Sequence, residues 1–367
     1  MKITDVTIRM CSAQSVQTLT KVKLAPGRVP DVLVLTLRTD DGVEGTSFGF
    51  GGVDARLSGA AVSSLKEFFL GRDPMAREQN LYQFREFDRK WNLFPIYAYG
   101  PFDNACWDIA GKVAGLPVHD LLGRAHDELP VYASSMFHPG GVPAYVEEAL
   151  EVKEAGFAGY KIHGPSPYRL DMAIHQAVRE AVGPDFNLMS DPVATYTYAE
   201  AMRVGRQLEE LDYLWLEEPV YDYDFNTLRR LARDLDIPIA ATETPAGLHF
   251  ITAEFISREC VDIVRTDASW RGGITAARKV AQLAESHGLP CEVHTSIYHP
   301  LEFANAHLAL SIPNTTFFEV LFPLTDFGGG LQTPLPIGDG TFKAMTAPGL
   351  GVDYDWEWIE RTTVGVY

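Results

Sequence analysis

The sequence of 367 residues is short of basic side chains. Lysine and arginine together number 31 against 49 aspartates and glutamates, which leaves a formal net charge of −18. Nucleic-acid backbones and anionic membranes both require a basic protein surface, so we expect neither as a partner. An anionic small molecule is not excluded, because a few cations or a metal ion can dominate one pocket.

Long apolar runs and paired cysteines are also missing. No stretch reaches the ~18 apolar residues of a membrane-spanning helix, and the N-terminal MKITDVTIRM lacks the apolar centre of a signal peptide. The four cysteines are widely spaced and form no CxxC pair. This usage is typical of a reducing compartment, so we expect a cytoplasmic protein with buried, unpaired thiols.

Residues 1–125 have the pattern of a small α+β unit. Residues 2–11 and 32–38 alternate as strands do, and the turn at Asp41-Gly42 predicts a hairpin after the second of them. Helical patterns follow at about 59–70, 76–89 and 101–114, and Gly115 with Pro117 ends the last helix.

Residues 126–325 alternate short apolar runs with amphipathic helical runs. The strand candidates are 130–135, 158–163, 187–191, 213–219, 237–243, 262–267, 290–294 and 315–320, and the intervening helices include 144–155, 199–210 and 273–286. This alternation predicts a parallel β/α barrel. The structural rival is a doubly wound sheet, which usually has a glycine-rich turn after its first strand, and none is present at 134–140.

Chemically capable side chains stand at the ends of the predicted barrel strands. Each lies about 25 residues, one β/α unit, beyond the previous one, and the set is Lys161 with His163, Asp191, Glu217, Glu243, Asp267, His294 and Glu319. Strand ends of a barrel converge on one mouth, where the active sites of barrel enzymes lie.

The middle positions Asp191, Glu217 and Glu243 are all acidic. Three carboxylates in one mouth repel one another unless a divalent cation neutralises them, and Mg²⁺ suits oxygen ligands. Zinc fits less well, because no histidine or cysteine stands among the three. The alternative is that these side chains cap helix N-termini.

Possible acid and base groups flank the three acids. Lys161 and His163 are two residues apart and face the same side of a strand, so each lowers the other's pKa and favours a neutral base. Asp267 and His294 predict a carboxylate–imidazole dyad. Glu319 is expected to donate a proton or a hydrogen bond to a developing oxyanion.

These residues resemble the enolase superfamily, and within it the mandelate racemase-like group. The resemblance covers nearly the whole chain and rests on Ala105–Lys112 with Gly115-Leu116-Pro117, on Leu216-Glu217-Glu218-Pro219, on Asp267 with Gly272-Gly273-Ile274-Thr275, and on the tail from Asp339-Gly340 to Val352. It implies a (β/α)7β-type TIM barrel of residues 126–325 with an N-terminal α+β capping domain of residues 1–125. Residues 326–367 would return to complete the cap.

The resemblance also implies roles for the strand-end residues. One Mg²⁺ per site would be held by Asp191, Glu217 and Glu243, and Glu319 would be the electrophilic partner of the substrate carboxylate. Proton transfer would fall to the basic residue of the second strand and to His294 paired with Asp267. Mandelate racemase has Lys-x-Lys on that strand, whereas here the second member is His163. By position we favour His163 as the base and Lys161 as the carboxylate ligand, with the reverse assignment open.

Two cap segments, about 12–30 and 46–52, are expected to close the mouth. Four side chains are predicted to contact substrate, namely Phe48, Tyr196, Trp270 and His299, although packing explains the last three equally well.

The expected reaction is removal of the α-proton of a small carboxylate through an ene-diolate, followed by dehydration of an acid sugar to a 2-keto-3-deoxy acid. A racemase or epimerase would use the same residues. A non-catalytic binding protein is a remote third possibility. Members of this group tend to form homo-oligomers, so the resemblance also implies a homo-oligomer here.

Overall fold

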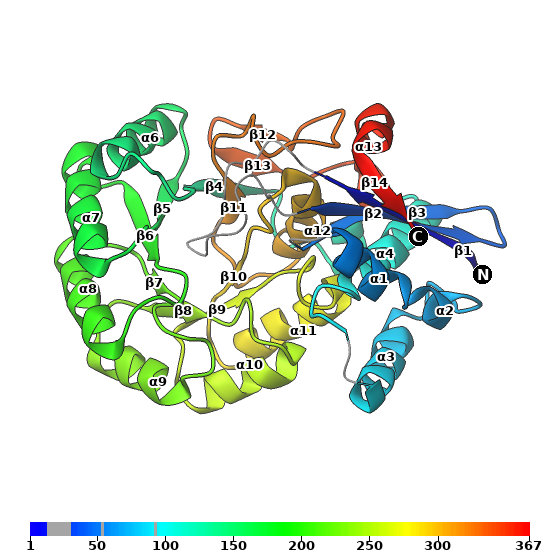
Figure 1. Ribbon diagram of the computed structural model, residues 1–367, viewed down its shortest axis with the longest axis horizontal. Coiled ribbons are helices and arrows are strands. Elements are labelled where there is room, and N and C mark those ends of the chain that lie inside the picture. The colour runs from blue at the N-terminus through cyan, green and yellow to red at the C-terminus, as the bar shows by residue number, and fades with distance from the viewer. Residues whose placement is uncertain (13–30, 53–54, 92–93) are drawn as a thin grey trace.

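The structure, a computed structural model, describes residues 1–12, 31–52, 55–91 and 94–367. Most of the predicted lid at 12–30 therefore lies outside the described residues. Figure 1 shows a sheet with helices at the right of the view and an arc of helices around a set of strands at the left.

The sheet at the right carries both ends of the chain. It is antiparallel with the order β14-β1-β2-β3, and its strands are β1 (Ile3–Cys11), β2 (Val32–Thr39), β3 (Glu44–Phe50) and β14 (Thr363–Val366). Because β14 pairs with β1, the last residues of the chain supply an edge strand for the first (Figure 1). The accompanying helices are α1 (Ala55–Ser63), α2 (Lys66–Phe69), α3 (Arg77–Trp91), α4 (Gly100–Ala114) and α5 (Val118–Leu122).

Helix α4 fixes this cap to the rest of the molecule. It is buried from Gly100 to Gly111, so its polar side chains need protein partners. Asp103 accepts hydrogen bonds from the backbone N–H (2.9 Å) and hydroxyl (2.8 Å) of Thr275, and Asn104 accepts one from the N–H of Ile274 (3.0 Å). The first turn of a barrel helix is thereby satisfied by the cap.

The other part alternates strand and helix. Its strands are β4 (Glu128–Ser134), β5 (Gly159–His163), β6 (Asn187–Asp191), β7 (Leu216–Glu217), β8 (Ile239–Ala241), β9 (Ile263–Thr266), β10 (Cys291–Val293) and β11 (Phe318–Leu321). The helices between them are α6 (Val142–Glu154), α7 (Tyr168–Val182), α8 (Tyr198–Glu210), α9 (Phe225–Asp234), α10 (Leu248–Ser257), α11 (Gly273–Ser286) and α12 (His299–Ala309). This succession is that of a (β/α)7β barrel, with the helices outside the strands in Figure 1.

Parallel pairing runs from β10 through β9, β8, β7, β6 and β5 to β4, and β11 pairs with β4 on its other side. Alternate residues face opposite ways, as strand geometry requires. Tyr132 belongs to a small cluster inside the strands with Met189 and Trp215, whereas Val131 packs in the larger cluster with the helices. The C-terminal part adds β12 (Ile337–Gly338), β13 (Thr341–Lys343), which pairs with β4, and α13 (Trp356–Thr362).

The predicted fold class is confirmed, and several elements agree closely. Helix α8 begins one residue before the predicted 199, where Thr197 and Glu200 form a capping box. Strand β6 matches the predicted 187–191, and β4 is one residue longer than predicted. Strand β7 is much shorter, with two residues where 213–219 was expected. The division at 125/126 and 325/326 stays a prediction. In the described residues no helix could span a membrane, and all four cysteines are buried and free.

Candidate active site

The mouth of the barrel holds the side chains that the sequence places at strand ends. His163, Asp191 and Glu217 are the last residues of β5, β6 and β7. On the other side of the mouth, one or two residues beyond a strand end, stand Glu243, Asp267 and His294. Strand ends are rigid supports, so groups from distant parts of the sequence share one site.

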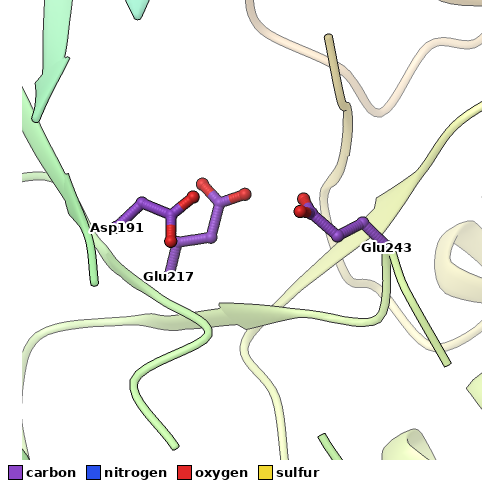
Figure 2. A group of neighbouring side chains, drawn as sticks. All are labelled: Asp191, Glu217 and Glu243. Atoms are coloured by element: carbon purple, nitrogen blue, oxygen red, sulfur yellow. The ribbon is translucent and has the colours of Figure 1, made fainter. Parts of the chain in front are cut away.

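The three predicted metal ligands lie together. Each of Asp191, Glu217 and Glu243 offers a carboxylate oxygen, and these oxygens are within 4.8 Å of one another. In Figure 2 Asp191 and Glu217 face Glu243 across a gap between strands. All three are buried. Such close buried carboxylates need positive charge between them.

Two fully buried cations lie beneath this group. The Nζ atom of Lys161 is 2.9 Å from Oε2 of Glu217 and 2.8 Å from Oε1 of Glu319. Nε of Arg265 is 2.8 Å from Oε1 of Glu217, and its Nη2 is 2.5 Å from Oε2 of Glu319. Sequence reasoning missed Arg265, although it lies two residues before Asp267 and therefore on the same face of the strand.

The charges in this cluster do not balance. The carboxylates of Asp191, Glu217, Glu243 and Glu319 face the two cations Lys161 and Arg265, which leaves two negative charges. Burial and the neighbouring Glu217 raise the pKa of Glu243 well above its usual value, and Oε2 of Glu243 has no hydrogen-bond partner. A divalent cation bound by three oxygen ligands fits both observations.

His163 and Lys161 occupy different levels of the site. His163 lines a cavity over the carboxylates; its Nδ1 is 2.6 Å from the carbonyl oxygen of Ser135, and its Nε2 is 3.1 Å from Oδ2 of Asp191. A carbonyl at Nδ1 fixes the proton there, so Nε2 is the atom left for proton transfer. Lys161 is fully buried and does not line the cavity.

The prediction that Lys161 and His163 lower each other's pKa is wrong for Lys161. Burial alone would lower the pKa of Lys161, but the carboxylates of Glu217 and Glu319 raise it well above its usual value. Lys161 is therefore a fixed positive charge in this arrangement.

His294 and Asp267 form the predicted dyad. Nδ1 of His294 is 2.8 Å from Oδ2 of Asp267, and Asp267 also accepts hydrogen bonds from the hydroxyl of Ser296 (2.5 Å) and from the N–H groups of Ser269 (2.6 Å) and Trp270 (3.0 Å). Burial lowers the pKa of His294, but the hydrogen bond and charge of Asp267 outweigh it, so the pKa is raised. Nε2 lies 3.4 Å from Oε1 of Glu243, one of the predicted metal ligands.

Glu319 is an acceptor in its contacts with the surrounding protein. Its Oε1 accepts from the hydroxyl of Ser134 (2.5 Å) and from Lys161 (2.8 Å), and its Oε2 accepts from Arg265 (2.5 Å) and from the N–H of Thr295 (3.1 Å). Burial opposes ionisation, but Lys161 and Arg265 hold the pKa of Glu319 well below its usual value. In this arrangement Glu319 is an ionised acceptor, and its predicted role as a donor to substrate stays a prediction.

The cavity over the carboxylates has a volume of about 260 Å³. Trp270 lines it as predicted, with its ring centroid 5.1 Å from that of His294 and 5.0 Å from that of Phe50. Phe50 also lines it and belongs to the segment 46–52 that was expected to close the mouth, although it was not singled out as a substrate contact. The buried Glu218, which also lines the cavity, was missed. A chamber of this size with apolar walls and a few polar groups suits a small molecule.

Three residues predicted to contact substrate lie outside this cavity wall. Phe48 lies two residues before Phe50 on β3, and its buried ring stacks on that of Tyr354. Tyr196 is buried in the barrel core and donates its hydroxyl hydrogen to Asp171 (2.7 Å). His299 is 3% exposed, and its Nε2 is 3.1 Å from the carbonyl oxygen of Leu321. These placements correct the prediction, because each side chain is committed to packing.

The fold and the site together define a barrel enzyme with a buried acidic triad suited to a divalent metal ion. Residues 144–358 match the family described as enolase C-terminal domain-like, and residues 8–123 match the N-terminal domain of mandelate racemase/muconate lactonizing enzymes. The chain belongs to this family of the enolase superfamily, as the sequence resemblance implies. Members of this superfamily use a divalent metal.

Characterised relatives are similar over most of the chain. Arabinonate dehydratase of Saccharolobus solfataricus is 32% identical over 254 residues, which cover 68% of this chain and 67% of the relative. D-galactarolactone cycloisomerase of Agrobacterium fabrum is 29% identical over 341 residues and 88% of each chain. The crystal structure of D-glucarate dehydratase from Agrobacterium tumefaciens, complexed with magnesium, superposes with a TM-score of 0.88 at 30% identity and covers both chains completely.

Proposed function

We propose that this protein is a Mg²⁺-dependent dehydratase that converts an acid-sugar carboxylate into a 2-keto-3-deoxy acid. The observation that carries the proposal is the placement of two histidines at opposite ends of the carboxylate group. Nε2 of His163 is 3.1 Å from Asp191, and Nε2 of His294 is 3.4 Å from Glu243. Similarity to two dehydratases supports the same reaction.

Asp191, Glu217 and Glu243 would hold the ion, and the absence of nitrogen and sulfur ligands among them favours Mg²⁺. The chemistry that Mg²⁺ supplies when bound is stabilisation of negative charge on the substrate carboxylate as the α-proton leaves. Lys161 and Arg265 keep Glu217 in place beneath the ligand group. The apolar rings of Phe50 and Trp270 exclude water from one wall of the cavity.

His163 takes the α-proton at Nε2, since Nδ1 is held by the carbonyl of Ser135. His294, whose raised pKa keeps a proton available, gives that proton from Nε2 to the departing β-hydroxyl, which leaves as water. The resulting enol becomes the 2-keto-3-deoxy acid. Asp267 orients His294 and stabilises its charged form.

The test is a product assay with a library of acid sugars that includes D-glucarate, galactarate, arabinonate and galactonate, each with Mg²⁺ and with EDTA. We expect keto-acid formation from at least one of them only with Mg²⁺. Exchange of the α-proton with deuterium and no keto acid would favour the racemase or epimerase alternative. Because one relative is a lactone cycloisomerase, D-galactarolactone is included, and its isomerisation without any dehydration would contradict the proposal.

Two further expectations belong to this proposal. A reducing cytoplasm is supported by four buried cysteines that are all free. Assembly into a homo-oligomer stays a prediction, which light scattering of the purified protein tests directly.

A further inference from the structure

Two polar side chains beyond the dyad support the carboxylate of Asp267. Its Oδ2 atom accepts a hydrogen bond from Nδ1 of His294 (2.8 Å) and another from the hydroxyl of Ser296 (2.5 Å). The oxygen of Ser296 in turn accepts a hydrogen bond from Nδ2 of Asn305 (3.2 Å), a residue of α12. Asp267, Ser296 and Asn305 are fully buried, so no solvent competes for these bonds.

The direction of each of these hydrogen bonds is fixed by its neighbours. Oδ1 of Asn305 accepts a hydrogen bond from the N–H of Ala268 (2.8 Å), so the amide presents its Nδ2 donors to the other side. Nδ2 also lies 3.0 Å from the carbonyl oxygen of His294. Because Asn305 donates to the oxygen of Ser296, the hydroxyl hydrogen of Ser296 is left for Asp267, whose carboxylate can only accept.

The backbone of Ser296 is held by the same helix. Oε1 of Glu302 accepts hydrogen bonds from the N–H of Ser296 (2.5 Å) and from the hydroxyl of Thr295 (2.9 Å). Glu302 and Asn305 are three residues apart and therefore lie on one face of α12. This face supports both the segment that carries His294 and the carboxylate that pairs with it.

We propose that Ser296, oriented by Asn305, is a positioning residue for proton transfer from His294. Two backbone N–H groups hold Oδ1 of Asp267, so the place of Oδ2 depends on Ser296. When His294 gives up its proton, its charge-assisted bond to Oδ2 weakens, whereas the bond from Ser296 stays. Ser296 therefore keeps the imidazole aligned in both states of His294. This inference rests on the proposed dehydratase function.

The test compares Ser296→Ala with the matched control Ser269→Ala. Both hydroxyls are fully buried, but that of Ser269 donates to the carbonyl oxygen of Leu301 (3.2 Å) and not to Asp267. Keto-acid formation and α-proton exchange are measured together, with an accepted acid sugar and Mg²⁺ in D₂O. Ser296→Ala should slow keto-acid formation by about tenfold or more while exchange through His163 continues, so the ratio of exchange to dehydration rises. Ser269→Ala should leave that ratio unchanged.

A double variant separates positioning from a general loss of structure. If Ser296 acts through His294, Ser296→Ala should cause no further loss of keto-acid formation in the His294→Asn background. A purely structural effect would instead multiply the two losses. Multiplied losses, or an unchanged ratio of exchange to dehydration in Ser296→Ala, would overturn the proposal.

A measurement without substrate distinguishes this proposal from the proposed function. In protein with ¹⁵N-labelled histidine, the Nδ1–H signal of His294 is identified by its loss in His294→Asn. Ser296→Ala should shift this signal and Ser269→Ala should not, because only the first removes a donor from Oδ2 of Asp267. A shifted signal in a protein that dehydrates no acid sugar would support the positioning of His294 and reject the dehydratase proposal. An unshifted signal would overturn the positioning role.

Discussion

Ionisable side chains serve different purposes in two parts of the active site. We call the layer beneath the carboxylates the floor and the surface that lines the cavity the wall. On the floor, Lys161 and Arg265 are fully buried and each contacts both Glu217 and Glu319. On the wall, His163 and His294 line the cavity, and the Nε2 atom of each lies close to one proposed metal ligand. The paired cations of the floor keep the carboxylates in place. Proton transfer instead requires a side chain with an atom free to reach the substrate and a proton that it can gain or lose.

The largest expected effect is on catalysis by the histidines of the wall. His163→Asn should lower kcat by about 10³- to 10⁴-fold, because it removes the proposed base. The melting temperature should change little, since Nδ1 of His163 makes one hydrogen bond, which the asparagine amide can replace. Steady-state kinetics and thermal unfolding check both statements, and a variant with nearly normal kcat would assign the base to another group.

The next effect falls on the stability of the floor. Arg265→Met should lower the free energy of unfolding by about 3 kcal/mol, because the buried charges of Glu217 and Glu319 then share a single cation, Lys161. Arg203→Met, at an exposed position, should change the free energy by less than about 0.5 kcal/mol. Equal urea stability of the two variants would show that Arg265 does not hold the floor.

A smaller effect separates a packed histidine from the two on the wall. Burial lowers the pKa of His299 to about 4. Between about pH 6.5 and pH 4, His299 is therefore protonated in the unfolded chain but not in the folded chain. Stability should therefore fall as the pH drops from about 6.5 toward 4. His299→Gln should reduce the loss between pH 7 and 5 by about 2 kcal/mol in urea titrations. An unchanged pH dependence would place His299 in contact with solvent, as a pocket residue is.

The smallest effect compares two aromatic residues of one strand. Phe50→Leu should raise KM about three- to tenfold with kcat nearly constant, because the ring lines the cavity. Phe48→Leu should leave KM unchanged and lower stability by about 1 kcal/mol, since that ring packs in a buried cluster between the cap and the barrel. If both variants changed KM equally, the cavity wall would extend farther into the cap than the structure shows.

The sequence predicts the scaffold and the metal ligands because both depend on local periodicity. The spacing of one acidic residue per β/α unit brings Asp191, Glu217 and Glu243 to one mouth without any knowledge of packing. The contacts that an individual side chain makes depend on residues that are distant in the sequence. Whether Tyr196 faces substrate or Asp171 is decided by helix α7, and the four donors that saturate Glu319 come from four separate segments.

Arg265 is an intermediate case, because its orientation follows from the sequence but its contacts do not. Its position two residues before Asp267 predicts a side chain on the inner face of the strand. An arginine inside a barrel is costly without partners, so its presence could have signalled buried carboxylates. Which carboxylates it bridges follows only from the closure of the strands around it, through its contacts with Glu217 and Glu319.

The division of labour between the two wall histidines is tested most directly by following the α-proton in the His294→Asn variant. The measurement is ¹H NMR of an accepted acid-sugar substrate in D₂O with Mg²⁺, with keto acid determined in the same tube. We predict that the α-proton still exchanges for deuterium, through His163, while keto-acid formation falls by about 10²-fold or more. Loss of exchange in this variant, together with retained exchange in His163→Asn, would contradict the assignment of His163 as the base and His294 as the acid.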